Sequence, residues 1–190
     1  MFAKLFKSKQ LLKTIIGIIL GILLLDQLTK QLARVFLQPL YSISVIGDYF
    51  RLTYIENPGI AFGLRISNKV IFTILSIIAV IIIFYYLFSL RDHKILRLAF
   101  ASILGGAFGN LIDRFLYGRV VDFLDFEFID INIPPFRLLF FDFSGYQMDR
   151  WPVFNVADIA VTIGMVMIIF NALLDLRPKK SVSYNGLQQN

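Results

Sequence analysis

Two aspartates, Asp122 and Asp158, have the residue type and the setting for proton-transfer chemistry. Asp122 lies in GRVVDFLDF, among apolar side chains, and Asp158 lies in FNVADIA. If two carboxylates share a partly dry site without a nearby cation, both cannot ionise easily, so one keeps a proton. The ionised carboxylate could take a proton from water as the water attacks an amide carbon, while the other donates to the carbonyl oxygen. This is the chemistry of an aspartic peptidase.

The spacing of these aspartates does not show that they meet. Asp125 is a rival for the position of Asp122, and spacing does not distinguish the two. Asp158 can also be explained as a negative charge at the start of a helix, where the helix dipole favours it. The residues alone therefore leave the catalytic pair open.

The elements that must position these residues are membrane-spanning helices. The chain has 190 residues, of which 57% are apolar and 17% charged, and its mean hydropathy is +0.72. Such a composition is more apolar than that of ordinary globular domains. About 20 helical residues cross a hydrocarbon core. Four segments are long enough, at about residues 11–35, 70–90, 96–116 and 156–176.

Two of these segments have an alternative interpretation. The lysines before the first segment are typical of a signal peptide, but no small-residue cleavage site follows the apolar run, so we predict a helix of the mature protein. The third segment carries polar residues at its far end and could lie at the membrane interface. Its glycines at 105, 106 and 109 favour close packing inside a bundle instead.

Basic residues near the segment ends predict the orientation, because cytoplasmic loops are enriched in lysine and arginine. They cluster before the first segment, between the second and third, and after the fourth. Both termini are therefore expected in the cytoplasm, with residues 36–69 and 117–155 outside. This topology accounts for the net charge of +6, so no nucleic-acid partner is needed. The absence of cysteine excludes disulfides, and a single histidine, His93, argues against a histidine-rich metal site.

The two outer loops differ in pattern. In the first, Phe50, Leu52 and Tyr54 alternate with polar residues, which predicts a strand, and an Asn57-Pro58-Gly59 turn follows. The middle of the second loop has no readable pattern. We expect an all-α membrane protein with four transmembrane helices and a small extracytoplasmic β-rich cradle. Residues 1–180 form one membrane-embedded domain, and residues 181–190 form a cytoplasmic tail.

Polar residues gather at the outer ends of three predicted helices. Asp26 and Lys30 are one turn apart, as are Asn110 and Arg114. Ionisable groups at this depth are costly and usually face a bundle interior or a cavity. Asp26 with Lys30, and Asp113 with Arg114 or Lys30, can also be explained as ion pairs that only tie helices together.

Five short motifs resemble those of the lipoprotein signal peptidase family, also called signal peptidase II. They occur in the family's order and are DQLTK at 26–30, ENPGIAFG at 56–63, GGAFGNLIDR at 105–114, GRVVDFLDF at 118–126 and FNVADIA at 154–160. The resemblance implies a bacterial inner-membrane aspartic peptidase with its site near the periplasmic face. Such an enzyme cuts the signal peptide from prolipoproteins just before a cysteine that carries diacylglycerol.

The resemblance also implies roles for individual residues. It makes Asp122 and Asp158 the catalytic pair and leaves Asp125 outside it. The positions that match site-lining or supporting residues of the family are Asp26, Lys30, Asn57, Asn110, Asp113, Arg114 and Asn155. Asn57 can equally be explained as a turn former. The implied partners are prolipoproteins and membrane lipids, for a monomer without cofactor or metal.

One segment, from about Glu127 to Arg150, looks longer than the family's usual connection between its two aspartates. Its aromatic residues could rest on the membrane surface or act as a lid over the substrate. A surface insertion without a catalytic role is the simpler alternative.

Two other classes of protein fit this sequence less well than a peptidase does. A small transporter usually brings its charges to the bilayer midplane, whereas here they collect at one end. A non-catalytic scaffold would explain the helices but not the pairing of Asp122 with Asp158.

Overall fold

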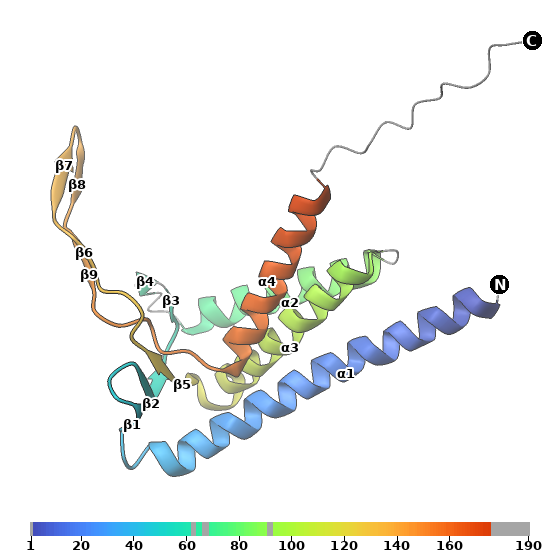
Figure 1. Cartoon of the computed structure of the whole chain (residues 1–190), viewed down its shortest axis with the longest axis horizontal. Coiled ribbons are helices and arrows are strands. Elements are labelled where there is room, and N and C mark those ends of the chain that lie inside the picture. The colour runs from blue at the N-terminus through green and yellow to red at the C-terminus, as the bar shows by residue number, and fades with distance from the viewer. Residues whose placement is uncertain (1, 62–63, 66–68, 91–92, 176–190) are drawn as a thin grey trace, which may run out of the picture.

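The computed structural model describes residues 2–61, 64–65, 69–90 and 93–175. Its helices are α1 (Phe2–Leu32), which continues into a π-helical segment, η1 (Ala33–Leu37), then α2 (Lys69–Ser89), α3 (Lys94–Tyr117) and α4 (Val156–Asp175). Figure 1 shows them as a bundle with the strands gathered at one end. The predicted boundaries agree within a few residues, except that α1 begins earlier. The predicted tail at 181–190 lies outside the described residues.

Helix α3 is the centre of the bundle, because it packs against each of the other three helices. Small residues make the contact with α4 close. A side chain at Gly106 would collide with the backbone of Ala157, and one at Gly164 would collide with Ile103. Gly106 therefore allows the close helix packing that the sequence predicted. In agreement, α3 is the most buried of the candidate membrane spans.

The described helices differ in how clearly they can cross a membrane. Three are long and apolar enough, namely Lys9–Leu37, Lys94–Tyr117 and Val156–Asp175. Helix α2 contributes a shorter apolar stretch, Thr73–Ser89. The outward side of α1 exposes leucines such as Leu20 and Leu24, which suits contact with lipid.

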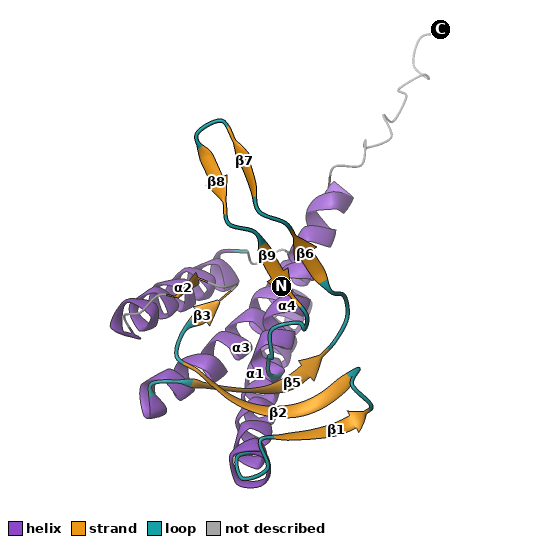
Figure 2. Ribbon diagram, turned by 90° about the vertical axis from the view of Figure 1, so that its left-hand side faces the viewer, coloured by secondary structure: helices purple, strands orange, loops and turns teal. Residues whose placement is uncertain are grey.

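A three-stranded antiparallel sheet caps the end of the bundle (Figure 2). Its order is β1 (Ser42–Ile46), β2 (Phe50–Asn57) and β5 (Val120–Phe126). The predicted strand around residues 50–54 is therefore confirmed as part of β2. Strand β5 is largely buried, pairs with β2 on one side and is bridged to Phe154 through Leu124. It consequently lies next to the start of α4. A short ribbon of β3 (Ile60–Ala61) and β4 (Leu64–Arg65) follows β2.

The second outer loop forms a long two-stranded arm, which we call the β-arm and define as residues 127–150. Strands β6 (Ile131–Ile133) and β9 (Tyr146–Met148) pair near its base, and β7 (Phe136–Leu138) and β8 (Phe141–Phe143) pair at its end. The predicted class, all-α, is therefore too narrow. These strands have three residues each. That length is too short for an alternating pattern to be recognised in a loop rich in phenylalanine.

Candidate active site

Asp122 is held by strand β5, whose pairing with β2 places it opposite Ile55. Its side chain is buried, and both carboxylate oxygens accept hydrogen bonds from amides. Asn155 Nδ2 donates to Oδ1 over 2.7 Å, and Asn57 Nδ2 donates to Oδ2 over 3.1 Å. A strand, a turn and a helix start thus converge on this one carboxylate.

Asn57 forms the predicted turn and also donates to Asp122, while its role in a catalytic site stays a prediction. Its Oδ1 accepts a hydrogen bond from the backbone N–H of Gly59 over 2.9 Å, which fixes the turn. Gly59 has a φ of 116°, a conformation that glycine adopts without strain. The turn in this way aims the amide nitrogen of Asn57 at Asp122.

Asp158 lies in the first turn of α4 and forms a reciprocal cap with Asn155. The backbone N–H of Asp158 donates to Asn155 Oδ1, and the backbone N–H of Asn155 donates to Asp158 Oδ2, each over 3.1 Å. This is the capping-box arrangement, with aspartate where glutamate is more usual. The predicted helix-start role of Asp158 therefore coexists with its place in the site.

Asn110 links the two aspartates through a chain of amides. Its Nδ2 donates to Asp158 Oδ1 over 2.8 Å, and its Oδ1 accepts from Asn155 Nδ2 over 3.1 Å. Asn155 Nδ2 also reaches Asp122. The structure consequently brings Asp122 and Asp158 into one hydrogen-bonded network, which sequence spacing left open.

The electrostatic environment of Asp122 favours its protonated form. Burial, and then the negative charge of Asp158, raise the pKa of Asp122 to about 7. The hydrogen bonds from Asn57 and Asn155 and the positive charge of Lys30 act in the opposite direction. A carboxyl group that titrates near neutral pH is suited to proton transfer.

A fully compensated ionic cluster lies next to this pair. We call it the support cluster and define it as Asp26, Lys30, Arg34 and Asp113. Lys30 Nζ lies 2.9 Å from Asp26 Oδ2 and 3.2 Å from Asp113 Oδ2, and all three side chains are fully buried. Arg34 lies 2.9 Å from Asp113 Oδ1. The predicted ion pairs of Lys30 with Asp26 and Asp113 are confirmed.

The support cluster also positions the backbone around the site. Asp26 Oδ1 accepts a hydrogen bond from the N–H of Ala157 over 2.9 Å, in the first turn of α4. Asp113 Oδ2 accepts one from the N–H of Val121 over 3.2 Å, next to Asp122. Each catalytic candidate is therefore one residue from a backbone group that the cluster holds.

The assumption that no cation lies near the aspartate pair is wrong. The positive charge of Lys30 acts on Asp122, and Arg114 lies within electrostatic range of Asp122 and Asp158. Arg34, which pairs with Asp113, was missed altogether. Its signal was present, because Arg34 follows Lys30 by one helical turn on the same face of the helix.

Asp125 occupies a different environment from Asp122. Thr53 Oγ1 donates to it over 2.6 Å, and Arg150 Nε donates over 2.9 Å. Arg150 also pairs with Glu127. A hydroxyl and a guanidinium group thus occupy the oxygens of Asp125, whereas asparagine amides hold Asp122. The structure thus ties Asp125 to the base of the β-arm.

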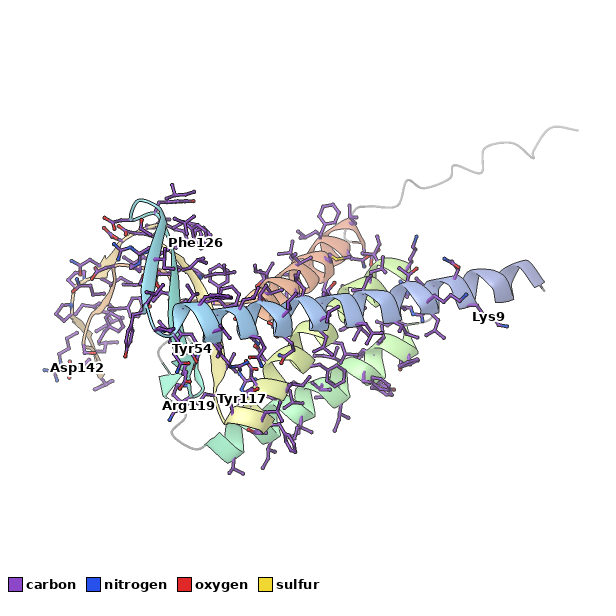
Figure 3. All side chains as sticks on the ribbon, turned by 90° about the horizontal axis from the view of Figure 1, so that it is seen from below. Lys9, Tyr54, Tyr117, Arg119, Phe126 and Asp142 are labelled. Carbon is purple, nitrogen blue, oxygen red and sulfur yellow. The ribbon has the colours of Figure 1, made fainter. Side chains whose placement is uncertain are left out.

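The rim of the site is polar and exposed. Arg119 Nη1 lies 2.7 Å from Glu56 Oε2, and Tyr54 Oη donates to Glu56 Oε1 over 3.0 Å. Figure 3 shows Tyr54, Arg119 and Tyr117 at one end of the helices, with Lys9 toward the other. Within the described residues, no group of three or more His, Cys, Asp and Glu side chains is arranged to hold a metal ion.

Comparisons with known proteins place this chain in a family. Residues 18–174 match the family model described as signal peptidase (SPase) II. The chain is 40% identical to a lipoprotein signal peptidase of Pelodictyon phaeoclathratiforme, over 85% of this chain and 92% of the relative. It is also 40% identical to one of Moorella thermoacetica, over 80% and 88%.

Solved structures agree with the sequence comparisons. A bacterial membrane enzyme matches with a TM-score of 0.69 and 31% identity, over 89% of this chain and 93% of the other. A second bacterial membrane enzyme structure matches with a TM-score of 0.66 and 31% identity, over 86% and 94%. The motifs, the fold and the relatives lead to one conclusion: the chain belongs to the signal peptidase II family of proteases.

Proposed function

We propose that the protein is an intramembrane aspartic endopeptidase that removes the signal peptide from prolipoproteins. It cleaves before the cysteine that carries diacylglycerol, and Asp122 and Asp158 are its catalytic pair. The observation that carries the proposal is the amide network that holds both carboxylates together, with the pKa of Asp122 raised to about 7. Membership of the family supports the substrate class.

The proposed mechanism uses one proton on the aspartate pair. At neutral pH Asp122 retains a proton in a large fraction of molecules. The ionised carboxylate of the pair then takes a proton from water as the water attacks the scissile amide carbon, and the protonated carboxylate donates to the carbonyl oxygen. Because the two groups interact, their titrations belong to the pair rather than to either residue.

Lys30 acts in this mechanism as a positioning residue. Its ammonium group has only donors, and it donates to Asn110 Oδ1 over 2.8 Å. The oxygen of Asn110 must therefore face Lys30, so its nitrogen must face Asp158. A buried lysine in this way sets the orientation of the amide that holds one catalytic carboxylate.

The position of the site suits a substrate that is itself in the bilayer. The aspartates lie at the sheet-covered end of the helices, which we assign to the outer, periplasmic face of the bacterial inner membrane. Helix α2 is the fourth span in this arrangement, and both termini face the cytoplasm. A monomer suffices, because every group in the mechanism comes from one chain. The signal helix and lipid chains of the substrate would enter sideways between helices.

The β1-β2-β5 sheet is proposed as the cradle for the substrate segment around the lipidated cysteine. Strand β2 begins at Phe50 and contains Tyr54, and Tyr49 directly precedes it. Photocrosslinkers placed at these three positions should reach a bound prolipoprotein. Crosslinks that never reach substrate would count against the cradle.

The decisive experiment is cleavage of a diacylglyceryl-modified prolipoprotein by the purified protein in detergent. Asp122→Asn and Asp158→Asn should each lower the rate by about 10³-fold or more, since general acid–base catalysis contributes about 10²–10⁴-fold. Asp125→Asn is the matched control, because it makes the same change on the same strand as Asp122 and should cleave at nearly the wild-type rate. If all three variants cleave like wild type, the pair is not the catalyst.

A further inference from the structure

The tip of the β-arm has unusual chemistry for a tight turn. Leu138 pairs with Phe141, so a two-residue turn of Leu139 and Phe140 joins β7 to β8. Such turns favour glycine, asparagine and aspartate, because they require left-handed backbone conformations. Leu139 nevertheless has a φ of 53°. The side chains of Leu139 and Phe140 are 81% and 100% exposed. Two apolar residues are therefore exposed to water at this tip, and the backbone of Leu139 also has a conformation that leucine disfavours.

The hairpin behind this tip has two different faces. Side chains alternate along a strand, so Phe136, Leu138 and Phe143 share one face. The rings of Phe136 and Phe143 lie 5.0 Å apart. On the other face, Arg137 Nε lies 3.1 Å from Asp142 Oδ1, and both side chains are highly exposed. The end of the β-arm is thus amphipathic, with an apolar tip.

The location of the β-arm indicates what covers its apolar face. The arm leaves the sheet at the same end of the helices as the aspartate pair and runs crosswise to α1 (Figures 1 and 2). A membrane-spanning helix runs from one face of the bilayer to the other. A segment that runs crosswise to such a helix at its outer end therefore lies along the membrane surface. Exposed aromatic rings are typical of that interface.

The charge of the β-arm argues that apolar contact, rather than attraction to phosphate groups, holds it there. Residues 127–150 contain four acidic residues and two arginines. Both arginines are already paired, Arg137 with Asp142 and Arg150 with Asp125. A net negative segment with occupied arginines is not attracted to anionic headgroups.

We propose that the β-arm is a membrane-contacting arm whose tip, residues 138–140, inserts into the outer leaflet beside the helices. Its partner is the lipid bilayer. The arm connects the strand that carries Asp122 to the helix that carries Asp158, so its contact with lipid anchors the connection between the two halves of the site. This role goes beyond peptide cleavage and can fail independently of it.

Tryptophan quenching in nanodiscs tests the proposal. Trp151 is the single tryptophan of the chain, so a Trp151→Phe background removes it. Single tryptophans are then introduced by Phe140→Trp, by Leu138→Trp and, as a control on the polar face, by Asp142→Trp. The full-length protein is placed in phosphatidylcholine nanodiscs with or without bromine on the acyl chains. We expect brominated lipid to lower the emission of the first two reporters at least twofold and that of the third by much less.

A turn variant provides a second, independent arm of the experiment. The double change Leu139→Asn and Phe140→Gly installs residues that favour the two-residue turn, so the hairpin is retained while the apolar tip is lost. In this variant, the Leu138→Trp reporter should lose most of its quenching by brominated lipid. Circular dichroism and cleavage in detergent should remain as in the parent protein.

Three outcomes would overturn the proposal. The first is no quenching at either apolar position, and the second is equal quenching at Leu138→Trp and Asp142→Trp. The third is a change in emission only when prolipoprotein is added, which would make the arm a substrate lid. None of these readouts requires peptidase activity, so they are separate from the test of the aspartate pair.

Discussion

Two groups of carboxylates lie side by side in this protein, and their partners differ. In the support cluster, Asp26 and Asp113 lie within 3.2 Å of Lys30 Nζ. In the aspartate pair, Asp122 and Asp158 accept hydrogen bonds from neutral amides of asparagine. Neutral amides position a carboxylate without cancelling its charge, whereas a lysine positions the carboxylate and also cancels its charge. The difference teaches that the first group holds the structure and the second can hold and move a proton.

The largest expected effect comes from removing Lys30, the fully buried cation of the support cluster. Lys30→Met leaves Asp26 and Asp113 buried without their shared partner and should lower the free energy of unfolding by about 3–5 kcal/mol. Thermal unfolding in detergent, followed by Trp151 fluorescence, measures it. Arg119→Gln is the control, because its exposed pair with Glu56 should be worth less than about 1 kcal/mol. Equal losses of unfolding free energy in Lys30→Met and Arg119→Gln would contradict the structural role of the support cluster.

The second prediction is that removing a charge from the aspartate pair stabilises the fold at high pH. The pKa of Asp122 is raised from 3.8 to about 7. Its contribution to stability is therefore complete below about pH 3.8 and is lost as pH rises through about 7. The free energy of unfolding of Asp122→Asn, relative to that of wild type, should therefore rise by on the order of 2 kcal/mol from pH 5 to pH 8.

The matched control for that gain is Asp125→Asn. It breaks the pair with Arg150 and should be destabilising at both pH values. Unfolding curves of the three proteins at pH 5 and pH 8 make the comparison. An Asp122→Asn variant that is less stable than wild type at pH 8 would show that Asp122 is a structural carboxylate like those of the support cluster.

The smallest predicted effect is a shift of the pH profile. In the proposed mechanism, cleavage needs a proton on the pair, so kcat/KM should fall as pH rises through about 7. The hydrogen bond from Asn57 favours the ionised form of Asp122, so Asn57→Ala should raise the pKa of Asp122 and move this limb to higher pH by about half a unit. Tyr54→Phe on the same strand should leave the limb in place. A shift to lower pH would refute the assignment of this limb to Asp122.

The helices could be predicted from the sequence because each contains an apolar run close to the length that a bilayer requires. Strand β2 could be predicted because its alternation covers several residues. The strands of the β-arm could not be predicted, because each has only three residues, which is too short for an alternating pattern to be recognised. Their pairing depends on contacts between Ile131 and Met148, far apart in the chain.

The candidate site could be predicted only in part. Spacing predicted that the polar residues gather toward one end of the helices, and Asp26 and Asn110 lie toward the sheet-covered end of α1 and α3. That this end faces outward stays a prediction. The contact of Asn110 with Asp158 depends on how closely α3 and α4 pack, which no spacing within one helix reveals. Likewise, the sequence could not distinguish Asp125 from Asp122, because the arginine that neutralises Asp125 lies 25 residues further along.

The reciprocal cap at the start of α4 ties the geometry of the proposed catalytic pair to the order of a helix end. Asp158 Oδ2 accepts the backbone N–H of Asn155, while Asp158 Oδ1 accepts Asn110 Nδ2 from α3. One carboxylate therefore fixes both the first turn of α4 and its attachment to the neighbouring helix. Fraying of that turn would move Asp158 out of the amide network that joins it to Asp122.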